Sequence, residues 1–164
     1  GAHFASVDAG LVGHKTRHNL AVLYFEQGRH AEAEAQWQQC LQEQPHFLPA
    51  LIGLGELALR QQRWDEVERI AVTLDDGRPL EASVLRARAH LGRSEHAQAR
   101  HLLEEIIQQA PSAIPPRRFL SYALLQEGKD PAAAENALRE LLALEPNDPE
   151  ATHNLQVLLG KRSD

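Results

Sequence analysis

Residues 14–47 contain the pattern that decides the fold. In order, the stretch includes Asn19-Leu20-Ala21-Val22-Leu23-Tyr24, Gly28, Ala33, Trp37, Cys40 and Pro45. Leu20 and Tyr24 share one helix face, because an α-helical turn takes about 3.6 residues. The glycine permits a tight reversal, and the proline ends a second helix because it has no backbone N–H to donate. The stretch therefore predicts two helices joined by a short turn.

The same pattern returns along the chain. The small residue at which paired helices cross recurs as Ala21, Gly55, Ala87 and Ser121, at spacings of 34, 32 and 34 residues. A branched side chain there would push the two helix axes apart. We predict repeats over 14–47, 48–79, 80–113 and 114–148, and a final helix over 149–160 that covers the last repeat's apolar face. Residues 1–13 are predicted to be an extended lead-in or a frayed terminus, and residues 161–164 a tail.

Local signals predict where individual helices begin and end. Asp65 and Glu68, three residues apart, form a capping box for the second helix of the second repeat. Residues 77–79 end that helix early, which makes this the weakest joint of the array. Gly92 comes early in the third repeat, so it predicts an early turn and a long second helix ending before Pro111.

Composition excludes several classes of protein. With 164 residues, 43% of them hydrophobic, the chain can bury the core of one domain. No run of about 18 apolar residues is present, so no membrane span is predicted. The net charge of −6 argues against a nucleic-acid partner, because phosphate binding needs a basic face. One cysteine allows no internal disulfide, which favours a reducing compartment or a protein indifferent to redox state, and we predict the cytoplasm. The start Gly1-Ala2, without methionine, suggests an excised segment.

Over roughly residues 14–160 the pattern resembles the tetratricopeptide repeat. The resemblance implies an all-α fold, a right-handed α-solenoid of about four helix pairs plus a C-terminal capping helix. It also implies that the first helix of each pair lines a concave groove that holds a partner segment. The implied groove residues are Val22, Phe25, Ile52, Glu56, Leu59, Val84, Arg88, Leu91, Arg118, Tyr122, Leu125 and Val157. Each could instead pack against neighbouring helices, since apolar residues at helical spacing are usually core.

The groove does not resemble two known variants of the family. The chaperone-tail clamp needs lysine and asparagine where this chain has His18, Val22 and Gly53. The asparagine ladder of sugar-transferring relatives is absent, because Asn19 and Asn154 are separated by the equivalent residues Gly53, Leu85 and Phe119.

Arg88 and Arg118 define a hypothesis about the partner. An apolar groove with two arginines favours a mostly apolar segment that carries a carboxylate. On this hypothesis, reversing both charges abolishes binding without unfolding the chain. The alternative is that Glu56 satisfies one arginine internally.

Candidate chemical groups are few. His14 and His18 have the spacing of two zinc ligands on one helix face, but no third ligand stands at motif spacing, so no metal or cofactor is predicted. Cys40 lies at a small-residue position and is predicted to be an inert buried thiol. No phosphate-binding glycine loop, serine elbow or Asp-x-Asp motif is present, so the chain is predicted to be non-enzymatic.

These observations favour a protein–protein interaction module, or scaffold, that binds a protein or peptide segment. The alternative is a substrate-positioning or regulatory segment of a larger bacterial enzyme. Residues 6–21 resemble the junction at which a family 2 glycosyltransferase domain is followed by such repeats, which implies an upstream catalytic domain.

Overall fold

The computed structural model describes residues 13–162, and all regular structure within that range is α-helical. The helices are α2 (His14–Glu26), α3 (His30–Glu43), α4 (Leu48–Arg60), α5 (Trp64–Asp75), α6 (Pro79–Gly92), α7 (His96–Gln109), α8 (Ile114–Glu127), α9 (Pro131–Leu144) and α10 (Pro149–Arg162). They form four successive pairs and a final helix, which confirms the predicted all-α helical repeat fold. Residues 1–12 of the predicted lead-in lie outside the described range.

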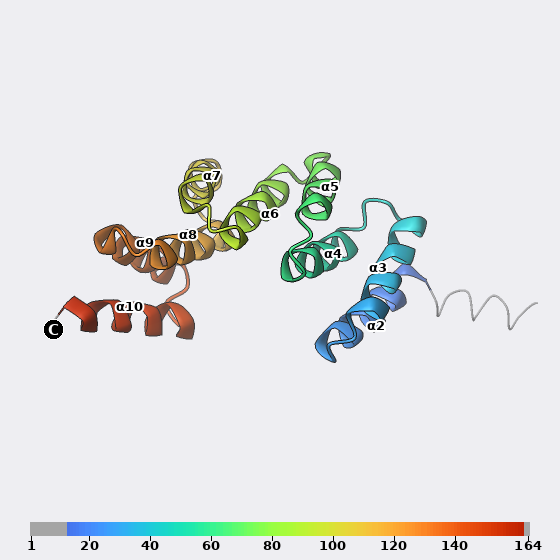
Figure 1. Ribbon diagram of the computed structural model, residues 1–164, viewed down its shortest axis with the longest axis horizontal. Helices are drawn as coiled ribbons and strands as arrows, with labels where there is room; N and C mark the ends of the chain where they lie inside the picture. Colours follow the sequence, from blue (N-terminus) through green and yellow to red (C-terminus); the bar gives the residue numbers. More distant parts are fainter. Residues whose placement is uncertain (1–12, 163–164) are drawn as a thin grey trace, which may run out of the picture. The chain divides into compact units, whose positions relative to one another are not determined.

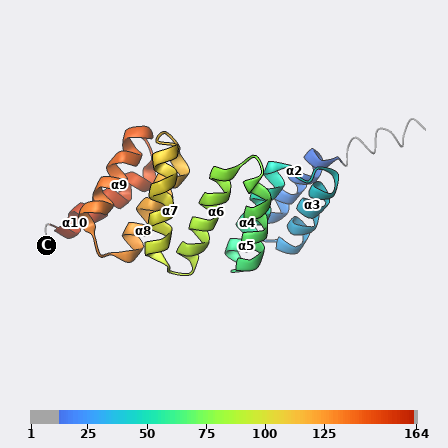
Figure 2. The ribbon, with the colours of Figure 1, turned by 90° about the horizontal axis from the view of Figure 1, so that it is seen from above.

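The chain divides into two compact units. Unit 1 ends at Gly77 and contains α2 to α5, whereas unit 2 begins at Arg78 and contains α6 to α10. In unit 1, α2 packs against α3, and α4 packs against both α3 and α5 (Figures 1 and 2). In unit 2, each helix packs against the next, and α6 also touches α8. The division follows α5, where the sequence predicts the weakest joint.

The predicted crossing residues lie at the centres of the helix pairs. Ala21 and Ala87 are fully buried, Ser121 is almost so, and Gly55 is buried as well. Small side chains are therefore needed at these four places, as the spacing predicts.

The turns inside the helix pairs share one backbone feature. Gly28, Gln62, Ser94 and Gly128 have φ angles of 75°, 57°, 59° and 69°, at the same spacings as the crossing residues. The prediction for Gly92 is wrong, because this glycine is the last residue of α6 and Ser94 takes the left-handed conformation of the turn. The spacing from Gln62 to Ser94 is 32 residues rather than 34 because the intervening helix α5 is shorter. It has 12 residues, whereas α3, α7 and α9 each have 14.

Gln62→Gly is expected to stabilise the chain by about 0.5–1 kcal/mol. A left-handed conformation costs a residue with a Cβ about 1–2 kcal/mol, which exceeds the entropy that glycine loses on folding, about 0.5–1 kcal/mol. Urea unfolding checks the change. The matched control is Gln61→Gly, because Gln61 has a φ of −89° and gains nothing from glycine there. Equal effects at both positions would contradict the strain argument.

Asp130 and Asp148, each followed by a proline in the sequence, are also predicted to begin helices, and both of these starts are confirmed. Asp130 accepts a hydrogen bond from the backbone N–H of Ala133 (3.0 Å). Asp148 accepts one from Ala151 (2.8 Å), so each aspartate caps the helix that follows it. The capping box of Asp65 is wrong: α5 begins one residue earlier, at Trp64, and its N-cap residue is Arg63, because the turn leads directly into the helix.

Two predicted boundaries also shift. Pro79 is the first residue of α6, where a proline's missing N–H costs nothing, rather than the last residue of the preceding repeat. Lys161 and Arg162 continue α10 instead of forming a tail. Basic residues in the last turn of a helix interact favourably with its dipole.

Candidate binding surfaces

The predicted groove residues all lie on the first helices of their pairs or on the final helix, and each unit carries its own set. The first-helix surface of unit 1 consists of Val22 and Phe25 on α2 and Ile52, Glu56 and Leu59 on α4. The first-helix surface of unit 2 consists of Val84, Arg88 and Leu91 on α6, Arg118, Tyr122 and Leu125 on α8, and Val157 on α10. Ile52 and Val157 are each 43% exposed, and the other members are half-buried. Each surface therefore presents one open aliphatic side chain among partly covered neighbours.

Phe25 joins three helices of unit 1. Its ring stacks on His30 (5.4 Å between centroids) and lies 5.8 Å from Trp37. The guanidinium of Arg60, at the end of α4, lies over the Phe25 ring, 4.8 Å from its centroid. Phe25 therefore holds α2, α3 and α4 together as well as contributing to the first-helix surface.

Trp37 is the central side chain of unit 1. It is only 3% exposed, and its indole Nε1 donates a hydrogen bond to Nδ1 of His18 (3.0 Å). The indole also occupies the space beside Gly53, where any Cβ would overlap it. This contact explains why position 53 is a glycine.

His18 therefore has a packing role. Burial lowers the pKa of His18, because a desolvated imidazolium is disfavoured. In residues 13–162 the structure shows no group of three or more His, Cys, Asp or Glu side chains arranged to hold a metal ion.

Cys40 lies at the same helix interface. It is fully buried, and its Sγ donates to the backbone oxygen of His14 (3.1 Å). Burial, together with the nearby Glu43 carboxylate, raises the pKa of this thiol. Both effects disfavour the reactive thiolate, which agrees with the prediction of an inert residue.

The first-helix surface of unit 2 is built around an aromatic pair. Phe119 and Tyr122 on α8 meet edge to face at 5.8 Å, and the Arg88 guanidinium lies over the Phe119 ring at 4.6 Å. The Tyr122 hydroxyl donates to Glu150 on α10 (2.9 Å). Burial, and then this hydrogen bond, raise the pKa of Tyr122. Phe119 was not predicted to belong to this surface, although it lies three residues before Tyr122 on the same helix face; it also packs against the core of unit 2.

Arg118 is satisfied by the chain itself. Its guanidinium lies 2.5 Å from Asp148 and 2.9 Å from Glu145, two residues of the segment between α9 and α10. The anion that was expected from a partner is thus supplied internally, by these two carboxylates. The backbone hydrogen bond from Ala151, and then the contact with Arg118, lower the pKa of Asp148 although the side chain is buried.

Val84 and Leu125 have a structural role. Both pack against the core cluster of unit 2 that contains Leu103, Leu120 and Leu124. Leu125 also contacts the terminal cluster formed by α9 and α10. At these two positions the packing alternative has support, and only part of each side chain remains accessible.

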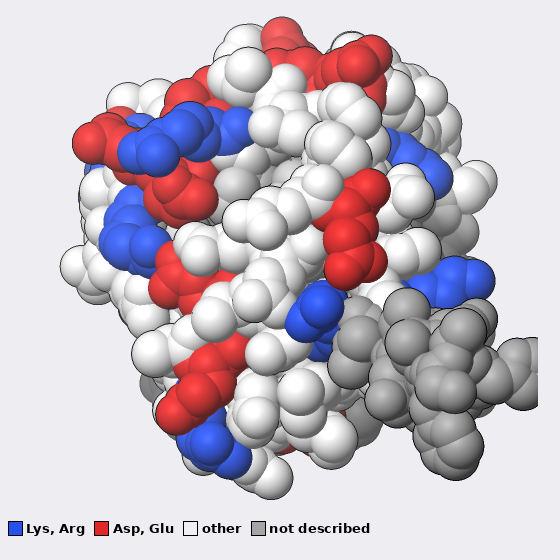
Figure 3. Space-filling view, turned by 90° about the vertical axis from the view of Figure 1, so that its right-hand side faces the viewer, with Lys and Arg blue, Asp and Glu red and all other residues white. Residues whose placement is uncertain are grey.

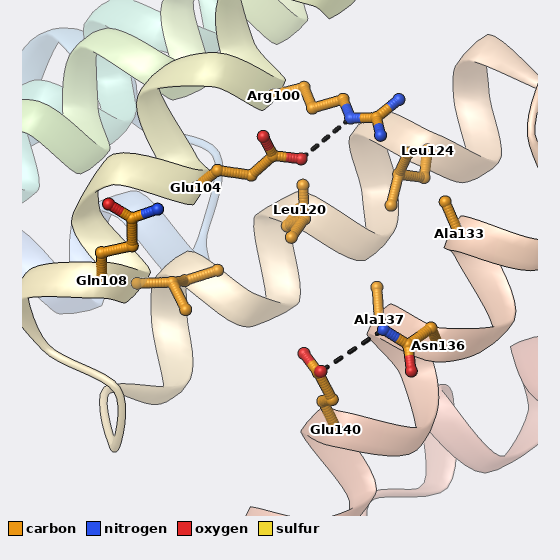
Figure 4. A pocket seen from close by; sticks show the side chains of 10 residues that line it. Arg100, Glu104, Gln108, Leu120, Leu124, Ala133, Asn136, Ala137 and Glu140 are labelled. Carbon is orange, nitrogen blue, oxygen red and sulfur yellow. Dashed lines mark hydrogen bonds and ion pairs between the residues drawn. The ribbon is translucent and has the colours of Figure 1, made fainter.

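A separate groove lies between the second helices of unit 2. It has a volume of about 340 Å³ and lies between α7 and α9, over Leu120 and Leu124 of α8 (Figure 4). Its rims carry internal pairs: Arg100 donates to Glu104 (2.9 Å) and Asn136 donates to Glu140 (3.3 Å). No sequence pattern marks this groove, which is lined on the α9 side by Ala133 and Ala137 together with Asn136 and Glu140.

One face of the molecule carries acidic and basic side chains in a mixed arrangement. On the face drawn in Figure 3, acidic and basic side chains alternate, and neither sign forms a continuous patch. Among residues 13–162, no helix is long and apolar enough to cross a membrane.

Comparison with solved structures places the fold in a known class. TTC0263, a thermophilic TPR protein of Thermus thermophilus, superposes with a TM-score of 0.76 at 21% identity, covering 92% of this chain and 83% of that one. YrrB, described as a TPR protein with an unusual peptide-binding site, gives 0.57 at 14% identity, covering 99% and 84%. At these identities the likeness shows the fold alone. The class is that of α-helical repeat proteins.

Sequence comparison finds the same kind of repeat. A tetratricopeptide repeat model matches residues 24–91 of the chain. Such repeats form protein–protein interaction modules and are generally non-catalytic. One curated relative, cellulose synthase operon protein C of Xanthomonas axonopodis pv. citri (strain 306), is 30% identical over an alignment of 140 residues that covers 79% of this chain. The chain spans only 9% of that relative's length.

Proposed function

We propose that this chain is a non-enzymatic interaction module whose first-helix surfaces bind a protein or peptide segment. The observation that carries the proposal is the pair of open aliphatic side chains, Ile52 in unit 1 and Val157 in unit 2, each 43% exposed. Around them lie half-buried apolar and aromatic side chains such as Leu59 and Tyr122. Tyrosine is enriched among the residues that contribute most binding energy to protein interfaces, and the side chains around such residues exclude water from the contact.

The bound segment is proposed to be mainly apolar on the side that meets these residues. Arg118 already has two carboxylate partners, so the carboxylate proposed from the sequence is not needed to neutralise it. No nucleic acid or membrane partner is proposed, because the net charge is −6 and the visible face has no basic patch. The proposed compartment is the cytoplasm.

Peptide selection tests the proposal with matched variants in each unit. Peptides selected from a random display library on the whole chain are expected to bind at least about tenfold more weakly to Ile52→Glu or Val157→Glu, because a charge would enter an apolar contact. The controls are Val72→Glu on α5 and Leu144→Glu on α9. These also replace an exposed aliphatic side chain (58% and 39% exposed), but they lie on second helices, outside the proposed binding surfaces. Fluorescence anisotropy gives the affinities. Selection of no peptide, or weaker binding only in the controls, would contradict the proposal.

A second candidate is that the module positions substrate or regulates catalysis within a larger bacterial enzyme. It is favoured by the similarity to a cellulose synthase operon protein that is far longer than this chain. Residues 6–12 of the junction-like sequence lie outside the described residues, so the resemblance to a glycosyltransferase junction stays a prediction. The native reading frame distinguishes the candidates: an upstream α/β catalytic domain would favour the second.

A further inference from the structure

His18 lies in an aromatic cluster that joins three parts of unit 1. Its Nδ1 accepts the indole N–H of Trp37 at 3.0 Å, and its ring meets the edge of Phe47 at 5.9 Å between centroids. Phe47 directly precedes α4, so the cluster links α2, α3 and the start of α4. An indole N–H can only donate, and therefore Nδ1 must be unprotonated in this arrangement.

We propose that the His18–Trp37 hydrogen bond is a pH-sensitive contact, which holds α2 on α3 while the imidazole is neutral and is lost on protonation. Protonation at Nδ1 converts the acceptor into a donor, so that two N–H groups face each other. The Trp37 indole, 3% exposed, would then have to move to find another acceptor.

The charged groups on the surrounding elements do not favour a charged His18. Arg17, its neighbour on α2, bonds to Gln39 and pairs with Glu43 on α3. Glu34 on α3 pairs with Arg63. The other titratable groups on these elements include His14, Cys40, His46 and Glu56. Burial is the cause of the lowered pKa of His18, without a compensating carboxylate.

The direction of the pH effect follows from that pKa. The folded state holds fewer protons at His18 than the unfolded state, where histidine titrates near about 6.5. The stabilising contribution is therefore complete above about pH 6.5 and is lost as the pH falls through the lower, folded-state pKa.

The contact borders the first-helix surface of unit 1. Val22 and Phe25 lie four and seven residues after His18, on the same face of α2, so movement of α2 would displace both. The pH-sensitive contact stands whether or not that surface binds a partner, and the following test measures the contact without a partner.

The indole resonances of the whole chain report the contact directly. In proton–nitrogen NMR spectra from pH 7.5 to 5, the Trp37 indole signal is expected to titrate with a midpoint below 6.5, whereas the Trp64 signal does not follow it. The variant Trp64→Phe assigns the two signals. In His18→Gln, whose side-chain oxygen can accept the bond but cannot titrate, the Trp37 titration is expected to disappear.

Stability gives a second measurement. Between pH 7 and pH 5 the unfolding equilibrium constant of the wild type should rise about tenfold more than that of His18→Gln. The reason is that protonation of His18 leaves the buried indole N–H of Trp37 without its acceptor. His14→Gln, the neighbouring histidine that packs on Phe47 at 4.8 Å, should keep the wild-type dependence. A Trp37 signal that is constant with pH, or that still titrates in His18→Gln, would overturn the proposal.

Discussion

Gly53→Ala is expected to destabilise unit 1 by about 2–4 kcal/mol, although alanine is the better helix former. The new Cβ would lie 2.7 Å from Cδ2 of Trp37 and closer still to Cε2 and Cζ2. The indole is 3% exposed and cannot move outward without losing its hydrogen bond to His18. Overpacking costs about 1–3 kcal/mol and an unsatisfied buried donor about 1–3 kcal/mol, which together exceed the gain of about 1 kcal/mol in helix propensity.

Gly160→Ala is the matched control. Gly160 lies in α10, and a Cβ built on it would meet nothing within 4 Å. This change is expected to be neutral or stabilising by up to about 1 kcal/mol in urea unfolding. A double-mutant cycle locates the cause: in a Trp37→Leu background, which removes the ring, Gly53→Ala should cost less than about 0.5 kcal/mol. An undiminished cost there would mean that the clash is not with Trp37.

Asp148→Ala is expected to destabilise unit 2 by about 2–4 kcal/mol. The Asp148 side chain is 6% exposed, caps α10 through Ala151 and pairs with Arg118 at 2.5 Å. Loss of a helix cap costs about 0.5–2 kcal/mol, and loss of one partner from a largely buried ion pair leaves the other poorly compensated. Asp148→Asn should cost less, because an amide oxygen can still cap the helix.

Two measurements separate these contributions. Because the folded-state pKa of Asp148 is lowered, its ionised form stabilises the fold above about pH 3.9, and this stabilisation is lost as the pH falls through the folded-state pKa. Asp148→Asn should remove that part of the acid dependence. The control, Glu104→Ala, breaks a more exposed pair with Arg100 and should cost less than about 1 kcal/mol. Equal costs for Asp148→Ala and Glu104→Ala would show that the buried contact contributes little.

The same contact changes how a binding test should be designed. Arg118→Glu would place a third carboxylate beside Asp148 and Glu145, so charge reversal at Arg118 is expected to destabilise unit 2. We therefore expect reversal of the charge at both Arg88 and Arg118 to destabilise the fold, which replaces the expectation that it leaves the fold intact. Variants at Ile52 and Val157 avoid the difficulty, because both side chains are already exposed.

The fold was predictable because its determinants are local and periodic. Small residues at spacings of 34, 32 and 34 require close helix crossings, and an aspartate followed by proline caps a helix by contacts within three residues. The caps act within one helical turn, and the small residues recur at a nearly constant period, so both signals can be recognised in the sequence. The turn predicted at Gly92 was nevertheless wrong. The residue with the left-handed backbone conformation is Ser94, and a residue other than glycine rarely adopts that conformation.

The candidate site was less predictable because its contacts join distant residues. Arg118 and Asp148 are 30 positions apart, and no spacing rule marks them as partners. Gly53 appeared only as a missing groove residue, whereas its meaning depends on Trp37 of the preceding helix. Sequence periodicity identifies which face of a helix is occupied, but it does not identify the side chain from another helix that occupies it.

The division after Gly77 gives the protein an unequal distribution of optical probes. Both tryptophans of the chain, Trp37 and Trp64, belong to unit 1, whereas the aromatic residues of unit 2 are Phe119 and Tyr122. Tryptophan emission consequently follows the unfolding of unit 1, while circular dichroism follows the helices of both units. If the two transitions coincide during denaturation, the chain unfolds in a single cooperative step; if they separate, each unit has its own unfolding equilibrium.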